Sequence, residues 1–156
     1  MTTILLTTHI NAPIDICFDL ARDIDVHQLT TSQTKEKAIA GKTAGLCEEG
    51  DVIVWEATHL GIKQKLTSRI TKMDKPNCFE DKMEKGAFAF MKHIHTFKEE
   101  SGQTLMIDEF SFAAPFGFFG VIAEKILLKN YLSKFLQLRN RQLKAMAELN
   151  TQNSIP

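Results

Sequence analysis

Apolar residues recur at steps of three and four along the last part of the chain, over Phe118–Leu149. The stripe consists of Leu128, Tyr131, Phe135, Leu138, Gln142, Met146 and Leu149, and is widened by Leu127, Leu132, Leu136 and Leu143. On a helix, the opposite face carries Lys129, Lys134, Arg141 and Lys144. The pattern predicts one long amphipathic helix that covers a sheet, rather than a coiled coil or a membrane-surface helix.

The beginning of the chain alternates with a period of two, and Thr2–Ile10 is therefore predicted to be a strand with one buried face. Pro13 ends this strand and suits the first turn of a helix. Helical spacing of apolar residues then predicts a short helix from Ile14 to Ala21 and a second over Ile24–Leu29.

Strand-like segments follow one another through the middle of the chain. They are Lys35–Ala40, Asp51–Leu60, Ile62–Met73, Cys78–Glu84, Phe88–Lys98 and Thr104–Phe112. Turn-forming residues separate them. The order predicts an α+β fold in which the C-terminal helix covers an antiparallel sheet of about seven strands. Residues 1–150 are expected to form a single domain, and residues 151–156 a flexible tail.

This order of elements resembles the helix-grip fold of the START-like superfamily, also called SRPBCC, over about Thr2 to Leu149. Shorter motifs are similar to a bacterial ligand-binding subgroup, some of whose members are named as cell-division inhibitors. The motifs are Trp55–His59, Phe79–Asp81, Gly86, Phe90, His93–Phe97, Asp108 and Pro115–Gly117. The resemblance implies a cavity between the curved sheet and the long helix. It does not identify a ligand.

Composition narrows the classes of function. Nineteen basic and nineteen acidic residues cancel, so no overall charge favours nucleic acid or an anionic membrane. No apolar run approaches the roughly 20 residues that span a bilayer. Three widely spaced cysteines, Cys17, Cys47 and Cys78, are expected to be reduced thiols. A cytoplasmic protein with no integral membrane segment is expected.

Strand alternation predicts which side chains face the cavity. On the Ile62–Met73 strand, the face without lysine and arginine is taken as inward, Ile62 included, whereas Phe88, Phe90 and Ile94 are expected outside. The predicted ligand-binding residues are Trp55, His59, Gln64, Leu66, Ser68, Ile70, Phe79, Asp81, Met91, His93, His95, Met106, Asp108, Phe110, Phe118, Tyr131 and Phe135. Phe118 belongs to Phe116–Ile122, an aromatic segment with glycines that is expected to form the cavity mouth or to pack under the short helices.

Four of these residues are polar and carry most of the possible chemistry: Asp81, His93, His95 and Asp108. Buried carboxylates are costly unless they are paired, and histidine is a natural partner. Three interpretations stay open. The side chains satisfy one another and stabilise the sheet, they contact a polar group of a ligand, or the His-x-His pair binds a metal with the carboxylates. The two-residue spacing is common, so no metal is assigned.

The leading functional hypothesis is sequestration, transport or sensing of a small hydrophobic molecule, such as a lipid, a fatty acid or a polyketide-like compound. The first alternative is an enzyme of the polyketide cyclase or hydratase type, in which the histidines and aspartates act as acid and base. The second is a protein-interaction module. No cofactor and no nucleic acid are expected, and the protein is expected to be a monomer or a homodimer.

Overall fold

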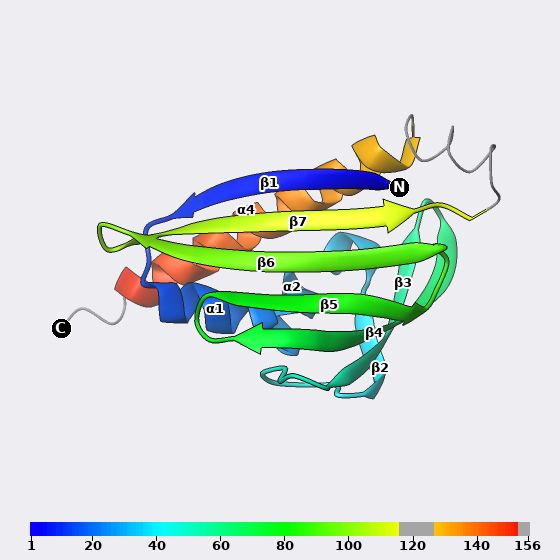
Figure 1. Cartoon of the computed structure of the whole chain (residues 1–156), viewed down its shortest axis with the longest axis horizontal. Helices are drawn as coiled ribbons and strands as arrows, with labels where there is room; N and C mark the ends of the chain where they lie inside the picture. The colour runs from blue at the N-terminus through cyan, green and yellow to red at the C-terminus, as the bar shows by residue number, and fades with distance from the viewer. Residues whose placement is uncertain (116–126, 153–156) are drawn as a thin grey trace.

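The computed structural model describes residues 1–115 and 127–152. Its elements are β1 (Thr2–Ile10), α1 (Ile14–Arg22), α2 (Ile24–Thr30), η1 (Ser32–Thr34), β2 (Lys37–Gly41), β3 (Val52–His59), β4 (Ile62–Asp74), β5 (Cys78–Lys85), β6 (Phe90–Glu100), β7 (Gln103–Ala113) and α4 (Lys129–Gln152). Figure 1 shows one sheet with the helices on a single side. The described residues therefore have the predicted α+β architecture.

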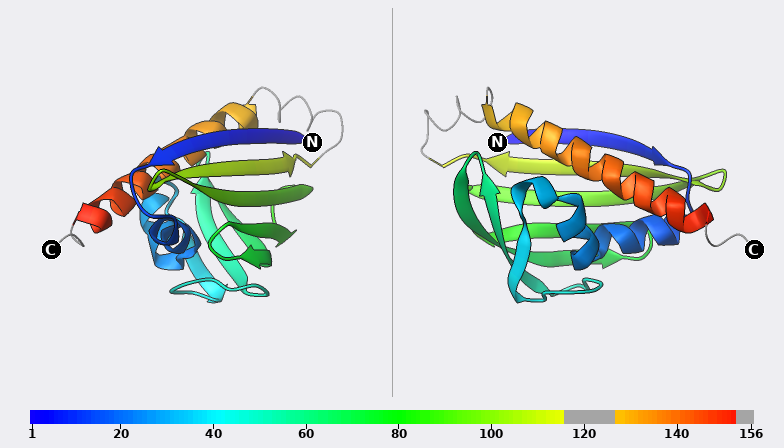
Figure 2. Two further views of the ribbon diagram at one scale, coloured as in Figure 1. Left: turned by 60° about the vertical axis from the view of Figure 1, so that its left-hand side comes forward. Right: turned by 180° about the vertical axis from the view of Figure 1, so that it is seen from behind.

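The sheet has seven antiparallel strands in the order β1-β7-β6-β5-β4-β3-β2. From β2 to β7 each strand pairs with its neighbour in sequence, and β1 then joins the edge of β7, with Thr2 opposite Phe112. Register shifts interrupt the pairing in β2 and β4. Because such irregularities bend and twist a strand, this side of the sheet curves toward α4 (Figure 2).

The long C-terminal helix is confirmed, but its buried face differs from the prediction. The buried residues of α4 are Leu132, Leu136, Arg139, Asn140, Leu143 and Ala147. Leu149, assigned to the apolar stripe, is 58% exposed. The predicted stripe included the polar Gln142 but neither Arg139 nor Asn140, which are two of the buried residues of this face. The buried face is therefore centred on Leu132, Leu136 and Leu143, which the prediction had placed at the margin of the stripe.

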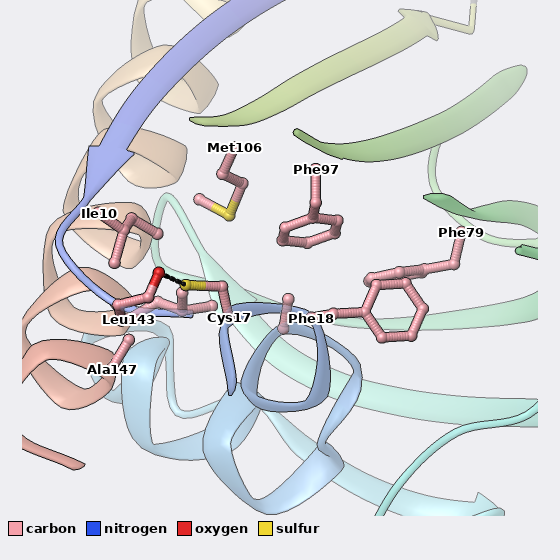
Figure 3. Close-up of a cluster of buried hydrophobic side chains, with 10 residues drawn as sticks. Ile10, Cys17, Phe18, Phe79, Phe97, Met106, Leu143 and Ala147 are labelled. Carbon is pink, nitrogen blue, oxygen red and sulfur yellow. Dashed lines mark hydrogen bonds between the residues drawn. The ribbon is translucent and has the colours of Figure 1, made fainter. Parts of the chain in front are cut away.

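Beneath the C-terminal half of α4 the core is continuous. Figure 3 shows Ile10, Cys17, Phe18, Phe79, Phe97, Met106, Leu143 and Ala147 packed between the sheet, α1 and α4. The Cys17 thiol points to the carbonyl oxygen of Ala12 at 3.8 Å, and Phe18 packs edge-on against Phe79 and Phe97. The predicted cavity position of Met106 is wrong, because this fully buried side chain belongs to the packed core.

None of the helices in the described part of the chain is long and apolar enough to span a membrane. The tail predicted for residues 151–156 is described only at Thr151 and Gln152, which are the last residues of α4. Residues 153–156 lie outside the described residues.

Two leucines of α4 test which face of the helix is buried. Leu143→Ala should lower the free energy of unfolding by about 2–5 kcal/mol, because it opens a void in a packed core. Leu149→Ala should change it by less than about 0.5 kcal/mol, because Leu149 is mostly exposed. Urea denaturation of both variants measures the difference. Equal losses would contradict the helix orientation described here.

Candidate functional site

The N-terminal half of α4 does not fill the space above the sheet, and a cavity of about 330 Å³ remains there. Its floor consists of residues from β3 to β7, and its roof of α4 residues from Tyr131 to Arg139. The junction of α1 and α2, from Ala21 to Ile24, closes one side. Most of the wall is apolar, as the family resemblance implied.

Fourteen of the residues predicted from sequence lie in the cavity wall, and all were chosen from strand alternation or the helical stripe. They are Trp55, His59, Gln64, Leu66, Ser68, Ile70, Phe79, Asp81, Met91, His93, His95, Phe110, Tyr131 and Phe135. Asp108 does not line the wall but lies behind His93 and His95. The whole predicted mouth segment, Phe116–Ile122, including Phe118, lies outside the described residues.

Two predictions of side-chain direction are wrong. Ile62 was placed inside but is 63% exposed, because β4 begins there, beside the turn to β3 and beyond the cavity. Phe88 was placed outside but lines the cavity. It precedes β6, which begins at Phe90, so the alternation of that strand does not determine where its ring points.

A buried polar cluster forms one part of the wall, and Asp108 is at its centre. His93 Nε2 donates a hydrogen bond of 2.9 Å to Asp108 Oδ1, and Asn140 Nδ2 donates one of 2.7 Å to Oδ2. His95 Nδ1 lies 2.8 Å from Oδ1 and Arg139 Nη1 lies 3.5 Å from it. These contacts join β6, β7 and α4 through one carboxylate.

The surroundings of this cluster determine its charges. Burial alone raises the pKa of Asp108, but the two histidines outweigh burial and hold that pKa well below its ordinary value. Burial together with the charge of His95 lowers the pKa of His93 to about 4. At neutral pH, Asp108 is therefore an anion and His93 a neutral hydrogen-bond donor. Burial also raises the pKa of Asp81, and its contact with His95 reverses that shift.

Two nitrogens of this cluster are incompletely satisfied. Among the described residues, the buried side-chain nitrogen and oxygen atoms without a hydrogen-bond partner are His95 Nδ1 and Arg139 Nε. His95 Nδ1 is close to Asp108, but its approach is too bent for a good hydrogen bond. Arg139 is only 3% exposed and lines the cavity. Buried donors of this kind are costly unless something accepts their protons.

A second polar cluster lies in the same cavity wall, around Glu36. His27 Nε2 donates to Glu36 Oε2 at 2.6 Å, and His59 Nε2 lies 3.5 Å from Oε1. His59 Nδ1 is 2.9 Å from the hydroxyl oxygen of Tyr131. Burial alone raises the pKa of Glu36, but the two histidines outweigh it and lower the pKa to about 2. This cluster connects α2, β3 and α4.

Sequence reasoning missed four functional candidates: His27, Glu36, Arg139 and Asn140. Arg139 and Asn140 had a detectable signal, because they interrupt the otherwise apolar row of Leu132, Leu136, Leu143 and Ala147. A polar pair inside such a row indicates a buried polar contact. Glu36 had no such signal, because it lies between η1 and β2 in a polar stretch of sequence.

No protein-family model and no curated protein matches this sequence. Solved structures do match its fold. The Zhui aromatase/cyclase from Streptomyces sp. R1128 superposes with a TM-score of 0.75 at 14% identity, covering 94% of this chain and 93% of that one. A START superfamily protein from Mycobacterium smegmatis gives 0.73 at 11% identity, covering 96% and 99%.

A plant protein has the same fold. Ginseng major latex-like protein 151 from Panax ginseng gives a TM-score of 0.70 at 14% identity, covering 94% of this chain and 97% of that one. The similarity in each case extends over nearly the whole of both chains. The chain therefore has the helix-grip fold of START-like proteins.

The Glu36 cluster generates a prediction about pH. Because the folded-state pKa of Glu36 is lowered from 4.5 to about 2, ionised Glu36 stabilises the protein above pH 4.5, and this contribution disappears as pH falls toward 2. Glu36→Gln should therefore reduce the free energy of unfolding by about 1–3 kcal/mol at neutral pH. The gap between wild type and variant should narrow between pH 4.5 and about 2.

Urea denaturation across this pH range measures the gap. Glu99→Gln is the control, because Glu99 is an exposed carboxylate near the end of β6. It should behave like wild type. A gap that stays constant from neutral pH to pH 2 would contradict the assigned role of Glu36.

Proposed function

We propose that the protein binds a small hydrophobic molecule that carries an oxygen-containing polar group. The apolar body of the molecule occupies the cavity between the sheet and α4, and its oxygen accepts hydrogen bonds from the polar cluster around Asp108. The observation that carries this proposal is the combination of an apolar cavity with unsatisfied buried donors in its wall.

The size and lining of the cavity support an apolar ligand. Its volume of about 330 Å³ is at the lower end of the range of small-molecule sites. Aromatic and aliphatic side chains from both layers surround it, among them Trp55, Leu66, Met91, Phe110 and Phe135. Such a site excludes water and gains affinity from the apolar area that it covers.

The unsatisfied donors support a polar group on the ligand. Arg139 Nε is a buried N–H donor that has no acceptor among the described residues. A carbonyl, ether or hydroxyl oxygen supplies one. A carboxylate suits the site less well, because Asp81 and Asp108 already place two anions there.

The three free cysteines fit the reducing cytoplasm that the sequence predicts. Cys17 and Cys47 are buried, and burial raises the pKa of both thiols, so neither is an activated nucleophile. We therefore assign them to packing.

Filling the cavity should weaken binding without unfolding the protein. An uncharged naphthalene-based fluorescent probe should bind wild type at about micromolar concentration and be displaced by uncharged hydrophobic competitors. Leu66→Trp should weaken probe binding about tenfold or more, because the larger ring occupies the ligand's space. Leu5→Trp is the matched control, since Leu5 is 63% exposed on β1. Absence of probe binding to folded wild type would overturn the proposal.

A pair of ligands tests the polar contact separately. An aromatic ketone should bind more tightly than the hydrocarbon of the same shape, because its oxygen accepts from Arg139. Arg139→Met should reduce the ketone's affinity by about tenfold and leave that of the hydrocarbon nearly unchanged. Calorimetric titration measures both, and the hydrocarbon reports whether the cavity is intact. Equal losses for the two ligands would assign Arg139 to structure alone.

A second candidate function is acid–base catalysis on such a ligand, because His95 in the cavity wall lies between two carboxylates, Asp108 at 2.8 Å and Asp81 at 3.6 Å. A histidine placed in this way can give or take a proton. One protein with this fold is named as an aromatase/cyclase. Conversion of a bound polyketone by wild type, and not by His95→Asn, would support catalysis in addition to binding.

A further inference from the structure

We propose that Asp81, His93 and His95 form a binding site for one divalent transition-metal ion of the zinc type, open toward the cavity. This inference goes beyond ligand binding and does not depend on it. It also replaces the expectation from sequence, where the His-x-His spacing alone was too common to assign a metal.

The geometry brings the three side chains together on the cavity side of the sheet. Asp81 on β5 is the direct register partner of His93 on β6, and His95 follows on the same face of β6. Each residue offers one ligand atom, and these three atoms lie within 4.8 Å of one another. Because both strands belong to the sheet, the side chains start from a rigid base. Rigid placement of ligands favours metal binding.

The gap between His95 and Asp81 fits an ion better than a hydrogen bond. His95 Nε2 lies 3.6 Å from Asp81 Oδ1, which is longer than a good hydrogen bond. Two ligands that each lie about 2.1 Å from one zinc ion are separated by about 3.4–3.6 Å when they subtend an angle of about 110–120°. The observed distance agrees with that spacing.

Asp108 holds both rings in the form that a metal needs. His93 Nε2 and His95 Nδ1 each lie within 2.9 Å of Asp108 Oδ1. A nitrogen this close to a carboxylate oxygen carries a proton, because a lone pair in its place would be repelled. The free lone pairs are therefore on His93 Nδ1 and His95 Nε2. Asp108 accepts the ring proton of His93 and lies beside Nδ1 of His95, and a carboxylate in this position is the usual support for metal-binding histidines.

The charges around the cluster also call for a cation. Asp81 and Asp108 are two carboxylates, and the guanidinium of Arg139 is the one permanently charged cation that the described residues place against Asp108. His95 is in contact with both carboxylates, and its distance of 3.6 Å to Asp81 is longer than a good hydrogen bond. A divalent cation between His95 and Asp81 supplies the missing positive charge. Two imidazoles and one carboxylate select zinc-type ions over magnesium or calcium.

Three protein ligands leave at least one coordination position for a molecule in the cavity. Structural zinc sites have four protein ligands, whereas sites that bind exchangeable molecules have three. The proposed ion would therefore face the cavity and meet the oxygen of a bound molecule. In this arrangement the polar cluster would hold an ion that faces the cavity, in addition to stabilising the sheet.

Cobalt(II) alone is the probe for this site, because its visible absorption reports tetrahedral or five-coordinate binding. Wild type, stripped with a chelator and titrated with cobalt, should show one equivalent of bound ion, and zinc should displace it. Asp81→Asn and His95→Asn should each weaken cobalt binding by at least about 100-fold. His95→Asn retains a donor near the position of Nδ1, next to Asp108, and removes Nε2.

Asp108→Asn tests the positioning role of the buried carboxylate. It should weaken cobalt affinity by about 10–100-fold while the visible spectrum of the saturated protein stays the same, since no ligand is lost. His9→Gln is the control, because His9 is an exposed histidine on β1, outside the cavity. This variant should bind cobalt as wild type does. Thermal denaturation of each variant shows whether it is folded. If His95→Asn is unfolded, the cobalt affinity of Asp81→Asn tests the proposal.

The absence of a visible cobalt spectrum in folded wild type would overturn the proposal. Equal cobalt affinity in wild type and Asp81→Asn would also overturn it. Probe binding measured in the presence of chelator keeps the two proposals separate. A protein that binds the probe but not cobalt retains the proposed ligand function without the metal, and the opposite result retains the metal site alone.

Discussion

The burial of the Asp108 carboxylate is the constraint on which the rest of the structure depends. Its side chain lies halfway along β7, a strand that pairs with β1 on one side and β6 on the other, and it is not exposed to solvent. An isolated charge in that position costs several kcal/mol or more, so it requires partners with good geometry. They come from two layers: His93 and His95 on β6, and Arg139 and Asn140 on α4. The carboxylate therefore attaches the helix to the sheet.

This attachment divides the space under α4 into two parts. On one side of Arg139, the C-terminal half of the helix packs through Leu143 and Ala147 onto the cluster that contains Ile10, Cys17 and Phe18 (Figure 3). On the other side, Tyr131 and Phe135 cover the open space of about 330 Å³. The sheet curves around this space at β2–β4, where register shifts interrupt the pairing (Figure 2). The cavity therefore lies on the concave side of the sheet, between the sheet and the helix.

Two histidine–carboxylate clusters line this cavity, and their different surroundings indicate different roles. Glu36 is held between His27 and His59, which also contacts Tyr131, so its charge connects α2, β3 and α4. This cluster is well satisfied and fits a role in stability. The cluster around Asp108 retains two unsatisfied donors and an unfilled gap beside Asp81. A ligand or an ion gains most binding free energy where it satisfies such polar atoms in an otherwise apolar wall.

The order of elements, the antiparallel sheet and most of the cavity wall were predictable from local periodicity, because strand alternation and helical spacing depend only on local geometry. The inward positions of Leu66, Asp81 and His95 followed from it. The rotation of α4 and the pairing of Glu36 with two histidines were decided only by the tertiary structure. The sequence signal of Arg139 and Asn140 is that they interrupt an apolar row, but only the tertiary structure shows that Asp108 is their partner. Local periodicity predicts which face of a helix or strand is buried, whereas the partners of a buried charge are residues distant in the chain.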